Sequence, residues 1–567
     1  MKRSDLHRLT RRPAVIAWCV ALVMAAGLLA SIVLSRNNPE EVRLIRLLAK
    51  ASEWEHSSAP TTPELDLLNQ IRDRHDGHSP EDFIRHLLEE ATNGGRELRN
   101  PHRPQHFPQQ DNPAGDGTDR DHLSDAARQL SSVTSPSLAD LPAARRQIFE
   151  DYLAATTAEG ETRTMGETAL LAAAAATPPD PIALAMKGDL LRIQRFPAEA
   201  IATYVSAGTA GPESPEAVDA RMQALLCAAA HRRGVQLRRL LEEPAYQTAL
   251  RLLSPLHQND IVLAAGDFPG LVRVQFGLIL QQVGNSPGSA AVTLLCGVIW
   301  YVMLHQVAGL RLRSSWRSLL AAVLGALSVT ATLLILSLQE YHNAFEQSGD
   351  FLNDLLYFVA GVGLREEFSK LLFFAPLLLV LRRSSEAEVL VAAGCVGLGF
   401  AIAENLAYFA ASSGLDVWGR FVMANFFHIS LTALCGHALH RWVRRPAACW
   451  EQSLVVILSM VVLHGLYDFM LFSPDLPETM HLGGFSIILF IVLALRYLTT
   501  LRRVREPRGN AMGPEFVHLT GTALLFSSAL MLGSWDLGLA AALDALTRSA
   551  LELALLAGMF VWQLRGL

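Results

Sequence analysis

The distribution of hydrophobic positions divides the chain into three parts. An uncharged apolar run at 14–34 follows a basic N-terminus, and a polar stretch then continues to about residue 287. From there to the C-terminus, apolar segments of membrane-spanning length alternate with short polar connections. The pattern predicts an all-α, polytopic transmembrane helix bundle of about ten spans. A large polar insertion follows the first span.

Nine of the expected spans lie after the polar stretch. Their expected bounds are 289–310, 317–338, 351–381, 388–411, 418–442, 452–472, 482–498, 514–534 and 545–565. The segment 351–381 is too long for one upright helix, because 31 residues measure about 46 Å against a hydrocarbon core of about 30 Å. We expect it to tilt or break near Gly361 and Gly363.

Basic residues mark alternate connections of this array. Arg311, Arg382, Arg444 and Arg502 follow the second, fourth, sixth and eighth spans, whereas the connections 339–350 and 473–481 contain no Lys or Arg. By the positive-inside rule both termini are cytoplasmic and residues 36–287 are extracytoplasmic. We expect residues 1–35 to be a membrane anchor, because the apolar region of a cleaved signal peptide, the alternative, is usually only 7–15 residues long.

The composition argues against an ordinary soluble protein, a nucleic-acid binder and a disulfide-rich protein. Charged residues make up 18% of the 567, against roughly 25% in soluble domains, and mean hydropathy is +0.25. The net charge of −6 lacks the basic excess of a nucleic-acid binder, so we expect no nucleic-acid partner. The six cysteines are scattered without a CxxC pair, which excludes a recognisable disulfide framework or structural zinc site.

The polar insertion contains three expected segments. Residues 36–92 contain helical patterns. Residues 93–122 are rich in Pro, Gly, Asn and Asp and are typical of a disordered linker. Residues 123–287 are rich in Ala and Leu and are expected to form an α-helical domain. Residues 183–208 resemble a tetratricopeptide helix pair, with a second repeat beginning near 220–234. Such arrays bind peptides or proteins, so we expect a peptide or protein partner here, and a plain helical domain is the alternative.

Four consecutive spans contain ionisable residues far from their ends, where each charge costs roughly 2.5–3.5 kcal/mol on insertion scales. They are Glu366, Glu367 and Lys370 in the fourth span, Glu404 in the fifth, His428 in the sixth, and His464 and Asp468 in the seventh. At about 1.5 Å per residue, these positions fall in one layer between the midplane and the outer face. The membrane core of 288–567 is therefore predicted to hold a functional site.

These residues resemble the motifs of the PrsW family of polytopic membrane proteases, relatives of the CAAX-protease/bacteriocin-processing (CPBP) families. EExxK corresponds to 366–370 and FxxxEN to 400–405, where Phe400 and Asn405 are supporting residues. His428 precedes Gly436 by eight residues, and His464 precedes Asp468 by four. The resemblance covers 351–472. It implies hydrolysis of membrane-anchored proteins near the extracytoplasmic side of a bacterial plasma membrane, with an anti-sigma factor as the substrate of PrsW itself.

Roles follow from the chemistry of these side chains. We expect Glu366 to act as general base on water, with Glu367 orienting the water or sharing its proton. Lys370 lies three and four residues after the two glutamates and keeps one carboxylate charged. His464, held by Asp468 at i+4, is expected to polarise the carbonyl or protonate the leaving amine. His428 and Glu404 are expected to bind water or stabilise the oxyanion.

Two questions stay open at the level of sequence. Zinc is an alternative cofactor, with ligands among Glu366, Glu404, His428 and His464, but no HExxH is present, and we favour hydrolysis without a metal. Buried acids and histidines are also typical of proton-coupled transporters, although no inverted repeat is evident. In a non-catalytic receptor or scaffold, the exported domain would carry the function.

Overall fold

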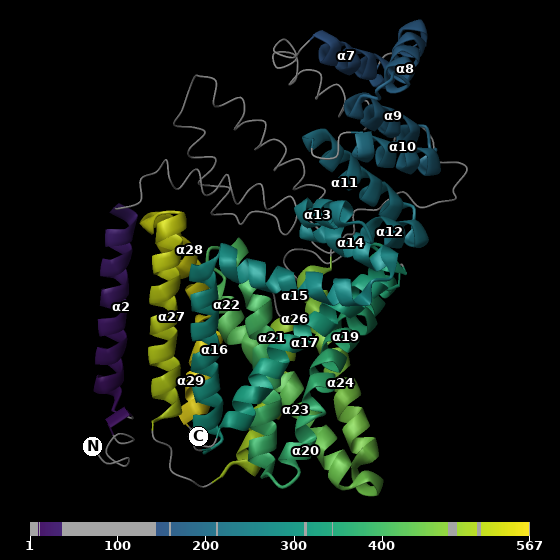
Figure 1. The fold of residues 1–567 in the computed structure, drawn as a ribbon. Coiled ribbons are helices and arrows are strands. Elements are labelled where there is room, and N and C mark those ends of the chain that lie inside the picture. The colour runs from purple at the N-terminus through teal and green to yellow at the C-terminus, as the bar shows by residue number, and fades with distance from the viewer. Residues whose placement is uncertain are drawn as a thin grey trace. The chain divides into compact units, whose positions relative to one another are not determined.

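The computed structural model describes residues 9–10, 12–36, 143–157, 160–210, 214–310, 315–342, 344–473, 485–506 and 512–565. The segment expected at 36–92 (apart from residue 36) and the linker expected at 93–122 lie outside these residues. Every element within them is helical. The chain divides into two compact units, Met1–Arg103 with Phe276–Leu567, and Pro104–Gln275 (Figure 1). The first is called the membrane unit below, and the second the helical unit.

Eight helices of the membrane unit are long and apolar enough to cross a membrane. They are α2 (Pro13–Arg36), α16 (Pro287–Val307), α17 (Trp316–Tyr341), α21 (Glu386–Ala411), the continuous run of α22 (Val417–Gly419), η3 (Arg420–Ala424) and α23 (Asn425–Arg444), then α24 (Pro446–Phe472), α26 (Phe485–Val504) and α27 (Pro514–Asp536). The chain is therefore a multi-pass membrane protein, as the hydrophobic pattern predicts.

Two of the ten expected spans are broken helices. The segment expected at 351–381 consists of α18 (Phe351–Leu356), the π-helical η2 (Tyr357–Gly363), α19 (Leu364–Phe374) and α20 (Leu377–Leu381). The irregular turn thus includes Gly361 and Gly363, where a break was expected. The segment expected at 545–565 is interrupted at Leu553, between α28 (Leu539–Glu552) and α29 (Ala554–Arg565). The exact number of crossings stays a prediction.

The centre of the membrane unit is α21, which packs against α16, α17 and α23. Glycines allow the close approach. A Cβ at Gly397 would collide with the backbone carbonyl of His428 on α23, and one at Gly399 would collide with that of Ala322 on α17. Small residues let helix backbones meet in membrane proteins, where apolar burial between helices gives little driving force. The crossing at Gly397 fixes His428 beside α21.

A second close crossing joins α24 to η2. A Cβ on Gly363 would lie 2.9 Å from the backbone nitrogen of Gly465, and a Cβ on Gly465 would meet the backbone of Val359. Neither position accommodates a side chain without movement of the backbone. The crossing therefore holds His464, the neighbour of Gly465, close to the first turn of α19.

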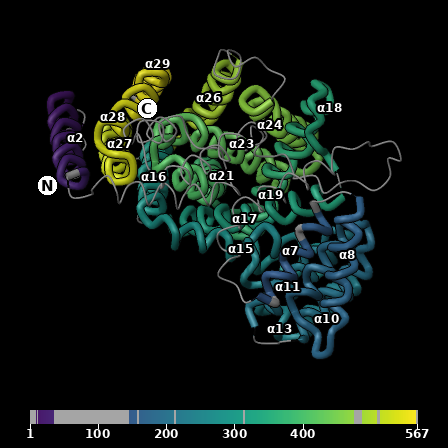
Figure 2. The backbone as a smooth tube through the Cα atoms, turned by 90° about the horizontal axis from the view of Figure 1, so that it is seen from above, coloured from purple at the N-terminus to yellow at the C-terminus, as the bar shows by residue number. Residues whose placement is uncertain are grey.

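The N-terminal helix is a packed member of the membrane unit. Figures 1 and 2 show α2 beside α27, and the hydroxyl of Ser527 donates a hydrogen bond to the carbonyl of Val23 at 3.2 Å. Gly27 faces Ser527 directly, without room for a side chain. These contacts make α2 a packed helix of the membrane unit, and its role as a retained anchor stays a prediction.

The helical unit is built of consecutive packed helices. They are α7 (Ala143–Thr157), α8 (Gly160–Ala174), α9 (Pro181–Ile193), α10 (Pro197–Ala210), α11 (Pro215–Ala230), α12 (Gly234–Leu241), α13 (Pro244–Leu252) and α14 (Pro255–Ala265). The pair expected at 183–208 is α9 and α10, with Gly188 against the ring of Tyr204. Burial raises the pKa of Tyr204, whose hydroxyl donates a hydrogen bond to Asp189. The tetratricopeptide assignment itself stays a prediction.

Candidate active site

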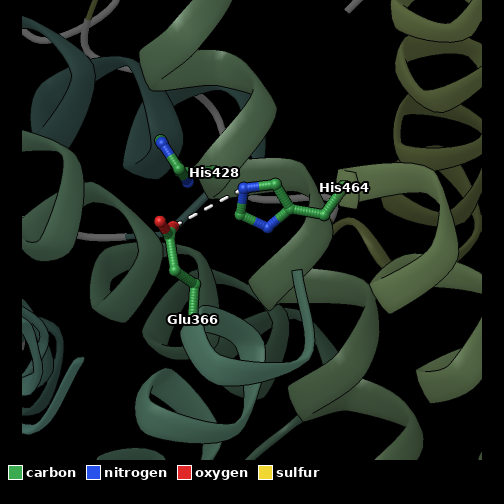
Figure 3. A group of neighbouring side chains, drawn as sticks. All are labelled: Glu366, His428 and His464. Carbon is green, nitrogen blue, oxygen red and sulfur yellow. Dashed lines mark ion pairs between the residues drawn. The ribbon is translucent and has the colours of Figure 1, made fainter. Parts of the chain in front are cut away.

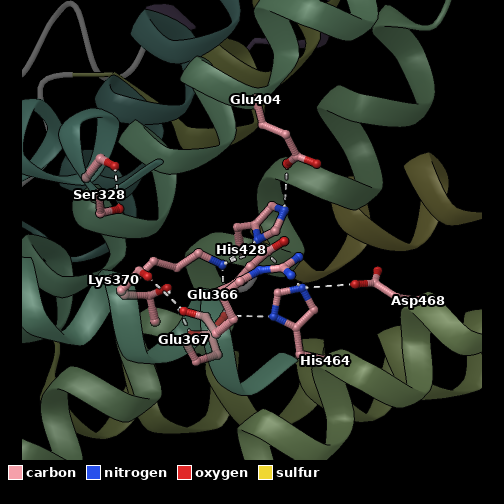
Figure 4. Close-up of polar contacts among 12 residues, drawn as sticks. Ser328, Glu366, Glu367, Lys370, Glu404, His428, His464 and Asp468 are labelled. Carbon is pink, nitrogen blue, oxygen red and sulfur yellow. Dashed lines mark hydrogen bonds and ion pairs between the residues drawn. The ribbon is translucent and has the colours of Figure 1, made fainter. Parts of the chain in front are cut away.

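The predicted site residues meet in one cluster inside the membrane unit (Figure 4). The helix α19 contributes Glu366, Glu367 and Lys370, α21 contributes Glu404 and Asn405, α23 contributes His428, and α24 contributes His464 and Asp468. Residues as far apart in the sequence as Glu367 and His464, 97 positions, are thus brought within hydrogen-bonding distance. The two glycine crossings described above set the helices at this separation.

Lys370 is the buried cation of the cluster, with no exposed surface. Its Nζ lies 2.9 Å from Glu367 Oε1, 3.3 Å from Glu366 Oε2 and 2.9 Å from His428 Nδ1. The ammonium also lies 4.0 Å from the centre of the Phe400 ring, within range of a cation–π interaction. The last residue of EExxK and the first of FxxxEN are therefore in direct contact.

His464 lies among three carboxylates, and the expected one, Asp468, is among them. Its Nδ1 lies 2.9 Å from Glu367 Oε1, whereas Nε2 lies 3.5 Å from Glu366 Oε2 (Figure 3) and 3.4 Å from Asp468 Oδ2. The i,i+4 spacing does place Asp468 beside the imidazole. The shortest contact, however, is the hydrogen bond that Nδ1–H donates to Glu367, while the carboxylates of Glu366 and Asp468 both lie near Nε2.

His428 has the same kind of carboxylate partner. Its Nε2 lies 3.0 Å from Glu404 Oε2, and its Nδ1 faces the ammonium of Lys370. Because an ammonium can only donate, Nδ1 carries the lone pair and Nε2 the proton. Each histidine therefore gives one nitrogen to a glutamate and turns the other toward the centre of the cluster.

Arg420, at the start of η3, belongs to the site and was missed by the sequence analysis. Its guanidinium lies 2.8 Å from Glu404 Oε2, donates to Asn405 Oδ1 at 2.6 Å and stacks 3.9 Å from the centre of the Tyr408 ring. It therefore holds both polar residues of FxxxEN. The signal was present, since an arginine near the expected outer end of a span runs against the positive-inside rule.

The cluster has a closed side and an accessible side. The side chains of Glu367 and Lys370 have no exposed surface, whereas those of Glu366, Asp468 and Glu404 are 14%, 16% and 27% exposed. Both recorded contacts of Glu366 use Oε2, and among the described residues Oε1 has no polar partner. Glu366, Asp468 and Glu404 therefore form the side of the cluster that reaches the surface of the membrane unit.

Three of the side chains could hold a metal ion. Glu366, His428 and His464 each offer one ligand atom, and these atoms lie within 4.8 Å of one another. Two imidazoles and one carboxylate are a common catalytic zinc set. The ammonium of Lys370 contacts both Glu366 and His428, so it would have to withdraw from His428 Nδ1 for that nitrogen to bind a metal. Glu404, the fourth expected ligand, instead binds His428 and Arg420.

Comparison with known proteins gives one match. Residues 314–496 match the family described as PrsW family intramembrane metalloprotease. The matched part contains all four motif helices of the cluster. No curated protein and no solved structure matches the chain significantly.

Proposed function

Residues 314–496 belong to the PrsW family of intramembrane proteases, and from this premise we propose that the chain is an endopeptidase that cuts membrane-anchored proteins. The observation that carries the proposal is the pairing of Glu366, partly exposed and with a free oxygen, with His464, whose Nε2 lies 3.5 Å away. A basic carboxylate next to an oriented imidazole at the accessible side of a buried cluster is suited to activating water.

The side chains divide the work as follows. Glu366 accepts a proton from the attacking water and returns it to the leaving amine. Glu367 orients His464, and the ammonium of Lys370 offsets the charge of both glutamates. Glu404 accepts a hydrogen bond from His428 and forms an ion pair with Arg420, so we assign it to orienting His428. It is unsuited to stabilising an oxyanion, because an ionised carboxylate can only accept hydrogen bonds.

We further propose that His428, His464 and one oxygen of Glu366 hold a divalent cation of the zinc type, which leaves the other oxygen of Glu366 as the base. Metal-bound histidines typically give their second nitrogen to a carboxylate, as both histidines do here. With neutral imidazoles, the four carboxylates of the contact network face only two permanent cations, Lys370 and Arg420, which leaves a formal charge that a divalent ion would balance. Such an ion lowers the pKa of bound water and polarises a carbonyl. Hydrolysis without a metal, favoured from sequence, is the untested alternative.

The proposed substrate is a membrane-anchored protein cut near the extracytoplasmic side of a bacterial plasma membrane, with an anti-sigma factor as one candidate. The basic connections support this orientation. In the proposed orientation the cluster lies toward the outer face, both termini lie in the cytoplasm and the polar insertion lies outside.

The test is to profile protein N-termini in membranes from cells that express the wild type, Glu366→Gln or Glu451→Gln at matched levels. Glu451 is an exposed carboxylate at the start of α24, so its variant is the matched control. We expect new N-termini near the outer ends of single-span proteins with the wild type and the control, and none with Glu366→Gln. Identical profiles for all three would contradict the proposal.

Two other functions are distinguished by the same variant. A proton-coupled transporter would lose transport with Glu366→Gln while cutting nothing, and a receptor or scaffold would be unaffected by it. Neither the transporter nor the scaffold accounts for the match to a protease family as directly as an endopeptidase does.

We also propose that the helical unit recognises substrates or a protein partner, because stacked helix pairs of this kind present extended binding surfaces. A chain lacking residues 36–260 is expected to cut a different set of proteins while retaining activity. An unchanged set of new N-termini would show that recognition lies elsewhere.

A further inference from the structure

An exposed apolar stripe runs along α15 (Phe268–Asn285), the helix that precedes the first span of the polytopic part. Its side chains are between 40% and 59% exposed and recur with helical spacing: Phe268, Val272, Phe276, Leu280 and Val283. At 100° per residue the five lie within one third of the helix circumference. Large apolar side chains gathered on one face usually mark an interaction surface.

The packing of α15 does not use this stripe. Leu271 and Gln275 are its buried side chains, and Gln275 donates a hydrogen bond to Asn259 on α14. At 100° per residue, these two residues border the stripe along one edge, about 60° and 20° beyond Phe268, and neither belongs to it. The stripe is therefore left for a partner outside the described residues of this chain.

The position of α15 along the chain identifies that partner. Only Ser286 separates Asn285 from Pro287, where the candidate membrane span α16 begins. The C-terminal end of α15 must therefore lie at the membrane surface. The helix is not itself a candidate span, since Arg273, Gln275, Gln281 and Gln282 interrupt its 18 residues.

We propose that α15 is an interfacial helix that lies flat on the bilayer, with the stripe in the boundary between headgroups and acyl chains. The helix contains no acidic residue, and its single charge, Arg273, borders the stripe, where it can reach lipid phosphate. At about 1.5 Å per residue, the stripe from Phe268 to Val283 is about 23 Å long. The proposal does not depend on the proteolytic function.

Spin labels test this proposal on the full chain in nanodiscs of phosphatidylethanolamine and phosphatidylglycerol. Nitroxides are attached to Val272→Cys, Phe276→Cys and Leu280→Cys, with Gln281→Cys as control on the opposite, exposed face. The labelled parent gives the background of the native cysteines, five of which are buried. We expect collisions with oxygen to exceed those with a water-soluble nickel complex at the stripe, and the reverse at Gln281→Cys.

Two outcomes would overturn the proposal. Nickel accessibility at the stripe equal to that of Gln281→Cys would place the stripe in water. Low accessibility to both reagents would show that protein, not lipid, covers it. Because three exposed positions are tested separately, a failure of one variant to fold leaves the other two to decide.

Discussion

Replacing Glu367 by alanine is expected to abolish cleavage and destabilise the membrane unit, whereas Glu366→Ala is expected to abolish cleavage alone. Glu367 is fully buried between Lys370 and His464, at 2.9 Å from each. Its loss leaves a buried ammonium without its closest partner. Breaking a buried ion pair costs about 3–5 kcal/mol, and the remaining contact with Glu366 at 3.3 Å favours the lower end of that range.

Thermal unfolding of the purified variants, measured beside their cleavage activity, separates the two roles. Glu367→Ala should lower the Tm clearly, and Glu366→Ala should leave it near that of the wild type, because Glu366 is partly exposed. The double variant Glu367→Ala/Lys370→Met removes both charges and should recover most of the Tm but no activity. Equal Tm values for the two single variants would contradict the division of labour between the glutamates.

That the site residues lie on separate helices at a common level was predictable from sequence, because it depends on local rules. A rise of about 1.5 Å per residue and the alternation of basic connections place Glu404, His428 and His464 in one layer of separate spans. The structure brings these three residues into one network of contacts, together with both glutamates of α19.

The pairing within the site was not predictable, because it depends on how helices cross. The i,i+4 spacing places Asp468 beside His464. The close contact of η2 and α24 at Gly363 and Gly465, however, also brings α19 near enough for Glu367 to accept a hydrogen bond from His464 Nδ1. Likewise, Arg420 reaches Glu404 from a π-helical segment that hydropathy does not reveal. The periodicity of the sequence predicts where the helices lie along the chain. Which side chains interact across the site depends on how closely the helices approach, and glycines set that distance.

Removing the metal is expected to remove the activity, by more than about 100-fold. If Glu366, His428 and His464 hold the ion, the wild type should bind one divalent metal per chain, and His428→Ala or His464→Ala should bind none. Glu367→Gln should weaken metal binding by about 10–100-fold, since the glutamate orients His464 without being a ligand. Bound metal is measured by elemental analysis of the purified protein, before and after chelation and zinc return.

His437→Ala is the matched control for these variants. His437 is a buried histidine on α23, but its partner is Glu386, outside the cluster, so its variant should retain metal and activity. Full activity in metal-free protein would overturn the proposed ligand role. In that case the free oxygen of Glu366 and the Nε2 of His464 would have to activate water alone, and activity would still depend on Glu366 while becoming insensitive to chelators.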